Sequence, residues 1–186
     1  TGSATLTDRA TAVSTGGAAT VDINNATLSG FNIAAAGTAT VGSNGTVTGT
    51  ATASNVATAT SVNDFADAGI AMATASGLGT GTGTLTVGNG GVISGTAALT
   101  NTATASTTDG TANTTALVDN DKVQGINLTA LNVGNGASIT AGASSTQTAS
   151  ASTTEDPGVA GNGSAATVAG SDVITGLDTT AVTVGG

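Results

Sequence analysis

Three segments of the chain align with one another over their whole length without a gap, and each begins 46 residues after the previous one. They are VGSNGTVTGTATASNVATATS from Val41, VGNGGVISGTAALTNTATAST from Val87 and VGNGASITAGASSTQTASAST from Val133. A fixed period of this kind is the signature of repeat architectures, in which each unit buries its apolar face against its neighbours. The repeat therefore indicates a stack of similar units.

The repeat also extends toward both ends of the chain. GLDTTAVTVG near the C-terminus matches GINLTALNVG, and the N-terminal SATLTDRATAVS aligns with NGTVTGTATASN when Leu6 takes the place of Val47. We therefore expect one repeat domain over 1–186, with half-repeats at 1–30 and 176–186. The intact repeats are expected at approximately 31–78, 79–124 and 125–175.

After each VG turn, small apolar residues alternate with hydroxyl residues. In the first segment Val47, Ala51 and Ala57 fall on one side, and Thr48 and Thr58 fall on the other. A period of two is typical of β-strands, whereas a helix would distribute these residues around its surface. We expect an all-β fold, a β-solenoid of about four 46-residue repeats with a thin Ala/Gly/Val core and outward Thr/Ser ladders. A repeat of this length fits either two small turns or one large turn.

Amide side chains recur midway along the three alternating segments. Asn55, Asn101 and Gln147 occupy equivalent positions. Sixteen residues at about 3.3 Å each span roughly 53 Å, which is long for one strand. We therefore expect each segment to bend at its amide.

The composition excludes most catalytic and nucleic-acid functions. The chain has no Cys, His, Trp or Tyr, and its net charge is −9 with two basic residues. It therefore lacks thiolate and imidazole groups, and it has too few cations to neutralise a run of phosphates. We expect no enzyme activity, no nucleic-acid partner and, because apolar runs are short, no membrane span.

All eleven acidic residues lie outside the three aligned segments. Clustered oxygens are the ligands that Ca²⁺ prefers, so Asp119, Asp121, Glu155 and Asp156 are candidate calcium ligands, and no other cofactor is expected. The alternative is a solvated acidic rim. We favour the rim, because no segment matches an EF-hand or the calcium-binding solenoid repeat.

The two ends of the repeat array predict self-assembly. An array without polar caps leaves open strand edges that pair with other chains, and a contact between unlike ends does not close, so it produces fibres. We expect a structural subunit that forms a head-to-tail homopolymer. The predicted interface residues are Thr5, Leu6 and Thr7 at one end, with Val182, Val184, Gly185 and Gly186 at the other.

The Thr/Ala/Gly-rich, acidic, cysteine-free repeats resemble secreted bacterial β-solenoid proteins of the matrix-fibre or adhesin type. The resemblance implies an extracellular or cell-surface location, and the outward Thr and Ser residues are possible sites for glycans. Two other functions remain open: a repeat segment of a bacterial surface adhesin, and an ice-binding β-solenoid. The T-x-T motifs for the latter are Thr46/Thr48, Thr50/Thr52, Thr58/Thr60, Thr100/Thr102/Thr104 and Thr146/Thr148.

Overall fold

The protein is all-β and its strands pair in parallel. In the computed structural model the described residues form fourteen strands and no helix, and all the pairings between these strands are parallel. The predicted all-β class is therefore confirmed. The structure describes residues 1–24, 27–33, 37–71, 74–79, 83–108, 113–119, 121–154, 165–170 and 172–185.

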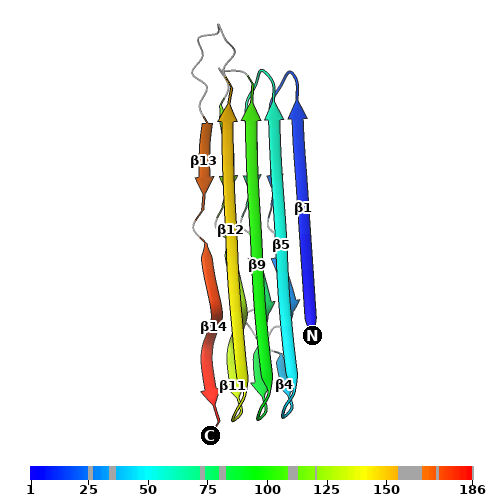
Figure 1. Ribbon diagram of the computed structural model, residues 1–186, viewed down its shortest axis with the longest axis vertical. Coiled ribbons are helices and arrows are strands. Elements are labelled where there is room, and N and C mark those ends of the chain that lie inside the picture. The colour runs from blue at the N-terminus through cyan, green and yellow to red at the C-terminus, as the bar shows by residue number, and fades with distance from the viewer. Residues whose placement is uncertain are drawn as a thin grey trace.

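Four long strands lie side by side and face the viewer in Figure 1. They are β1 (Gly2–Ser14), β5 (Thr46–Ser61), β9 (Val92–Thr107) and β12 (Ser138–Thr153). They form one sheet in the order β1-β5-β9-β12, which we call the front sheet.

Shorter strands carry the chain back behind the front sheet (Figure 1). One back sheet has the order β13-β10-β6-β2, and the other has the order β3-β7-β11-β8-β4 with β14 paired to β11. The strands of the first are β2 (Ala19–Ile23), β6 (Ala66–Ile70), β10 (Thr114–Val118) and β13 (Ala165–Ala169). The strands of the second are β3 (Thr27–Phe31), β4 (Thr38–Val41), β7 (Thr74–Leu78), β8 (Thr84–Val87), β11 (Lys122–Val133) and β14 (Val173–Val184).

Paired residues are separated by nearly constant distances along the sequence. In the front sheet Asn55 pairs with Asn101 and Asn101 with Gln147, in both cases 46 residues apart. The separation is slightly longer between β1 and β5, where Gly2 pairs with Gly49, and longer again between β11 and β14, where Val123 pairs with Ile174. Some pairs in the back sheets also depart from this value by a residue or two, as Ala66 with Thr114 shows, so the length of chain in each passage is nearly but not strictly constant.

The turn into each of the last three long strands contains a residue in the left-handed region. Asn44, Gly90 and Gly136 have φ angles of 58°, 69° and 70°. Each lies three residues after the valine that ends the preceding back strand. Glycine adopts this conformation without steric cost, and Asn is one of the few other residues that tolerate it. The aligned VG segments therefore mark the same turn in three places.

The inner long strands β5 and β9 bury alternate residues, as their period of two predicts, and the inward residues of the edge strands β1 and β12 are partly buried. In β5 Ala51, Ala57 and Ala59 are buried, whereas Thr46 and Thr52 are exposed. Successive side chains of a strand point to opposite faces of a sheet, so the alanines face the back sheets and the threonines face solvent.

The predicted bend at the midway amides is wrong. β5, β9 and β12 are each continuous over 16 residues, and they run straight through the molecule in Figure 1. Asn55 and Asn101 are buried on the inner face of the sheet. Hydrogen bonds to other side chains satisfy their amide N–H groups there, so the backbone needs no interruption.

The side chains of the interior change in size along the long strands. A cluster of mainly Ala fills one end, between β5, β9 and the first back sheet, and a cluster rich in Leu, Ile and Val fills the other end. Burial of each methyl group stabilises the folded state by only about 0.8 kcal/mol. The residues of the second cluster are Ile33, Val41, Leu78, Leu85, Val87, Ile93, Ile126, Leu128, Leu131 and Val133.

Glycines bring the front and back sheets into backbone contact between these clusters. A Cβ atom on Gly77 of β7 would overlap the backbone nitrogen of Thr96, and it would lie 2.6 Å from the Thr96 oxygen and 2.7 Å from the Gly125 oxygen. Gly49 and Gly95 of the front sheet face the carbonyl oxygens of Gly77 and Gly125 in the same way. Only glycine fits at Gly49, Gly77 and Gly95, and we call these close contacts the glycine contact layer.

The N-terminal strand pairs in a different register from the predicted one. Leu6 lies opposite Ala53, six residues beyond the predicted partner Val47. An even shift keeps the same side chains inside, so alternation alone does not distinguish these registers. In the observed register Leu6 packs against the cluster that contains Ala53 and Leu99, and Asp8 lies opposite Asn55.

Candidate functional site

Along the direction in which the strands pair, the molecule has two opposite ends, and both expose unpaired strand edges. β1, β2, β3 and β4 form one end, and β12, β13 and β14 form the other. Within the described residues no strand pairs with the outer edge of either set. Such edges present rows of backbone N–H and C=O groups to solvent and are templates for pairing with another chain.

Apolar side chains are exposed on β14, at the second of these ends. Ile174 is 48% exposed and Val184 is 71% exposed. Their partners one strand inward are Val123, which is 0% exposed, and Val133, which is 7% exposed. The same rows are therefore buried inside the molecule and uncovered at its edge. Leu177 and Val182 are exposed in the same way, with Ile126 and Leu131 as their buried partners.

The predicted interface residues divide between the two ends. Thr5, Leu6 and Thr7 belong to β1, whereas Val182 and Val184 belong to β14. Leu6 lies in the row that continues through Ala53 and Leu99 to Ser145, and Val184 lies in the row of Val87 and Val133. The two sets are therefore at opposite ends and in different rows. Gly185 follows β14, and Gly186 lies outside the described residues.

A row of polar side chains crosses the interior of the front sheet. Asp8, Asn55, Asn101 and Gln147 pair in register, one from each long strand. Asn55 Nδ2 donates to Asn101 Oδ1 at 2.8 Å, and Asn101 Nδ2 donates to Asp121 Oδ2 at 2.7 Å. Buried polar groups require such partners, and this explains why amides recur at this position.

The carboxylate of Asp121 is buried rather than part of a solvated rim. Its exposed fraction is 2%, and Gln147 Nε2 donates to its Oδ2 at 3.0 Å. Gln147 Nε2 also donates to Asp172 Oδ1, and the backbone N–H of Asp121 donates to the same Asp172 oxygen at 3.3 Å. The rim interpretation is therefore wrong for Asp121, because the recurring amides required a partner and this carboxylate is one.

Asp119 is the one other predicted calcium ligand that lies within the described residues. Asp119 directly follows β10, and its backbone oxygen accepts from Gln147 Nε2 at 3.1 Å. Glu155 and Asp156 lie outside the described residues. Within the part of the chain that is described, no group of three or more His, Cys, Asp or Glu residues in one copy could hold a metal ion.

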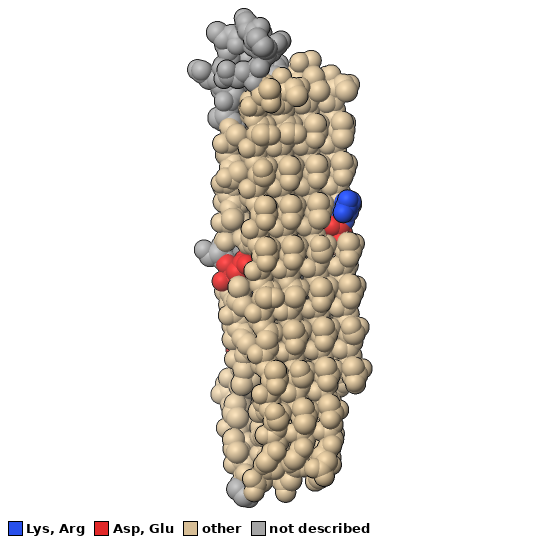
Figure 2. All heavy atoms as spheres, in the orientation of Figure 1, with Lys and Arg blue, Asp and Glu red and all other residues tan. Residues whose placement is uncertain are grey.

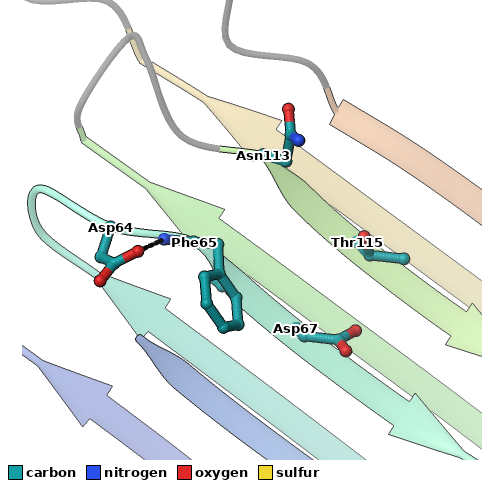
Figure 3. A pocket seen from close by; sticks show the side chains of 6 residues that line it. Asp64, Phe65, Asp67, Asn113 and Thr115 are labelled. Atoms are coloured by element: carbon teal, nitrogen blue, oxygen red, sulfur yellow. Dashed lines mark hydrogen bonds between the residues drawn. The ribbon is translucent and has the colours of Figure 1, made fainter. Parts of the chain in front are cut away.

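A shallow pocket of about 300 Å³ lies on the back of the molecule, over β6 and β10. Figure 3 shows the Phe65 ring between the side chains of Asp64 and Asp67. Asp64 Oδ1 accepts a hydrogen bond from the Phe65 backbone N–H at 2.8 Å. Burial raises the pKa of Asp67, and the nearby Asp22 carboxylate raises it further. The lining contains no base or nucleophile other than carboxylates and one Thr hydroxyl, so it offers little for catalysis.

The outer face of the front sheet is a regular array of hydroxyl groups. Thr11, Thr58, Thr104 and Ser150 form one outward row, and equivalent rows lie along the length of the sheet. Figure 2 shows basic atoms only at the right margin of this face and acidic atoms near both margins. Arg9 is the one charged residue that points outward from the four long strands.

Comparison with protein-family models, with curated proteins and with solved structures finds no match. The described residues contain no helix of the length and apolarity that crossing a membrane requires.

Proposed function

We propose that the chain is a β-solenoid of about four 46-residue repeats and the structural subunit of an extracellular filament or matrix fibre. Copies stack head to tail, and the unpaired edge of β12, β13 and β14 in one copy receives β1 to β4 of the next. All the pairings between the described strands are parallel, so a second copy in the same orientation continues every sheet without reversal. A contact between two different ends repeats without limit, which produces a fibre.

The observation that carries this proposal is the contrast between the exposed side chains of β14 and their buried partners in β11. Leu177 is 38% exposed, and its partner Ile126 is 0% exposed. A further layer of strands over β14 would bury Leu177, Ile174 and Val184 as their partners are buried. Burial of apolar surface stabilises association by roughly 25 cal/mol per Å².

Continuation of the internal rows defines the junction between copies. Leu6 of the next copy follows Ser145, because Leu6, Ala53, Leu99 and Ser145 form one row. By the same rule Val41 of the next copy follows Val184. Both predicted interface sets therefore lie at the junction, in separate rows.

Engineered disulfides test this stacking directly, since the natural chain contains no Cys. Thr7 and Thr146 occupy the two ends of one outward row. Within one molecule they are three strand spacings apart, about 14 Å, which exceeds the range of a disulfide. In the stack they are neighbours at about 4.8 Å, which is inside that range. We expect T7C/T146C to form covalent ladders of dimers, trimers and longer species under mild oxidation.

The matched control is T7C/T140C, in which the second cysteine lies on the same strand as Thr146 but about 20 Å further along it. This variant and both single-cysteine variants are expected to give no ladder beyond dimers. Electron microscopy of the unmodified protein provides the second measurement. A monodisperse monomer at micromolar concentration with no fibres, together with no T7C/T146C ladder, contradicts the proposal.

A repeat segment of a surface adhesin is the alternative that uses the same edges. There the strands that cover β1 and β14 belong to the same polypeptide instead of a second copy. The full reading frame distinguishes the two: many further 46-residue repeats favour the adhesin, and a signal peptide directly before Thr1 favours the filament subunit.

Ice binding is a second candidate function, and the array of outward hydroxyls favours it. The rows that contain Thr104 and Thr100 repeat at the strand spacing of about 4.8 Å, on a face with one charged side chain. Thermal hysteresis of the purified protein is the direct measurement. The control is the T100K/T104K variant, which should lose the hysteresis because it places charges in the outward rows. The same outward Thr and Ser residues are the proposed attachment sites for glycans, which mass spectrometry of native material would detect.

A further inference from the structure

The buried polar row has one acceptor without a donor. Asn55 is 1% exposed, and its Oδ1 has no hydrogen-bond partner. Its Nδ2 donates toward Asn101, so Oδ1 on the opposite side of the amide faces the other neighbour in the row, Asp8. A carboxylate beside an unpaired carbonyl oxygen leaves two acceptors adjacent, and neither group donates to the other.

The opposite end of the row already uses all of its donors. Gln147 has two amide hydrogens, and its Nε2 contacts three acceptors: the Asp119 carbonyl oxygen, Asp121 Oδ2 and Asp172 Oδ1. Asp172 is partly buried and lies between β13 and β14, the back strands that follow β12. Gln147 of β12 donates to it. A further carboxylate next to Gln147 would therefore have no free N–H group of this row from which to accept a hydrogen bond.

Head-to-tail stacking places Asp8 of the next copy in this position. The row Asp8, Asn55, Asn101, Gln147 continues with Asp8 of the following copy, about 4.8 Å from Gln147. The junction then gathers the carboxylates of Asp8 and Asp172 with the amide oxygens of Asn55 and Gln147.

The chain's own cations do not compensate these charges. Arg9 and Lys122 are its two basic residues. Arg9 is exposed on the outer face of β1, and Lys122 alternates with the buried Val123, so it points away from the interior. Carboxylates transferred from water into a protein interior require a compensating charge.

We propose that two stacked copies form a Ca²⁺ site at their junction, from Asp8 and Asn55 of one copy and Gln147 and Asp172 of the other. The inference rests on the proposed filament. Carboxylate and amide oxygens are the ligands of Ca²⁺, whose irregular coordination suits a site assembled from two surfaces, whereas Mg²⁺ demands a near-ideal octahedron and retains its water. A single copy holds only half of the ligands at each of its two ends, so the site forms only when two copies stack.

Sedimentation of the full chain with added CaCl₂, with MgCl₂ at equal ionic strength, or with EDTA tests the site. We expect Ca²⁺ to lower the protein concentration needed for pelleting, by about tenfold when free Ca²⁺ is ten times its dissociation constant. We expect Mg²⁺ to have a much smaller effect. Asp8→Asn keeps the shape of the side chain but removes the charge, so this variant should pellet in EDTA and lose the response to Ca²⁺.

Asp67→Asn is the matched control, because Asp67 lies in the inner strand β6 and should leave the Ca²⁺ response unchanged. Fibres that pellet equally in Ca²⁺ and EDTA overturn the calcium site and leave the filament standing. A Ca²⁺ response in Asp8→Asn equal to that of the unmodified chain also overturns the calcium site and leaves the filament standing. Protein that stays soluble under every condition overturns both proposals.

Discussion

Asn55 donates a 2.8 Å hydrogen bond to the Oδ1 atom of Asn101, its partner on the adjacent long strand. Asn101 in turn donates to Asp121, which comes from the back of the molecule. These three side chains are at most 2% exposed. The interior is therefore held together by a connected polar network as well as by alanine and valine methyl groups, and loss of one member leaves the others unsatisfied.

Replacing Asn101 should destabilise the fold strongly. Asn101→Ala removes a donor to the buried Asp121 carboxylate and the acceptor for Asn55 Nδ2, so we expect the free energy of unfolding to fall by about 2–4 kcal/mol. Urea denaturation followed by far-UV circular dichroism measures the change. Thr100→Ala, on the exposed face of the same strand, should change it by less than about 0.5 kcal/mol. Equal effects of the two substitutions would contradict a structural role for the network.

The pairing of the first strand predicts that two Leu-to-Ala substitutions in the same row differ in their cost to stability. Leu99 and Leu6 lie in one row, but Leu99 is 2% exposed in an inner strand and Leu6 is partly buried in the edge strand. We expect Leu99→Ala to cost about 2–5 kcal/mol and Leu6→Ala to cost less. Thermal or urea unfolding of dilute, unassembled protein gives both values. A larger loss for Leu6→Ala would be inconsistent with the observed pairing.

The glycine contact layer predicts an unusually sensitive glycine. A methyl group on Gly77 would overlap the Thr96 backbone, so we expect Gly77→Ala to cost about 3 kcal/mol or to prevent folding. Gly142 has its nearest neighbour, Thr96 Cγ2, at 3.9 Å from an added Cβ. Gly142→Ala should therefore be neutral or stabilise by about 0.5 kcal/mol, since Ala restricts the unfolded chain. Soluble yield and unfolding midpoints of the two variants provide the comparison.

The carboxyl group of Asp67 predicts a specific pH dependence. Burial, and secondarily Asp22, raise the pKa of Asp67 in the folded state, so the folded chain keeps this proton at pH values where the unfolded chain has lost it. Stability from this group is therefore present at low pH and is lost as the pH rises through the interval between the two pKa values.

Asp67→Asn should accordingly raise the urea midpoint near pH 7 and leave it unchanged well below the usual Asp pKa. Asp22→Asn should raise the midpoint near pH 7 by a smaller amount, because it removes only the lesser of the two causes. A midpoint for Asp67→Asn that stays below that of the unmodified protein at neutral pH would contradict this assignment.

Local sequence patterns predicted the strands and their faces, because these depend on residues that are close together in the chain. The alternation around Ala51 and Thr52 specifies which side chain points inward, and the residues at Asn44 and Gly90 specify where the chain turns. Both features follow from backbone geometry within a few residues.

Features that depend on contacts between distant segments were not predictable in the same way. The alignment of Leu6 with Val47 failed because every even shift preserves the inward face. The predictions of a bend at Asn101 and of a solvated Asp121 were wrong for one reason: the Asn101 amide donates to the Asp121 carboxylate in the interior, and the two residues lie on different strands and connections. An amide that recurs on an inward face signals a missing polar partner, and the nearby acidic residues were the available candidates.

The register of the sheets survives changes in the length of the connections. β12 pairs with β9 and β13 pairs with β10, although the chain from Thr153 to Ala165 is longer than the equivalent stretch from Thr107 to Thr114. Both strands keep their pairing with the preceding passage despite this difference in length. A peptide inserted between β12 and β13 would appear once per copy, so a stacked fibre would present it every four strand spacings, at intervals of roughly 19 Å.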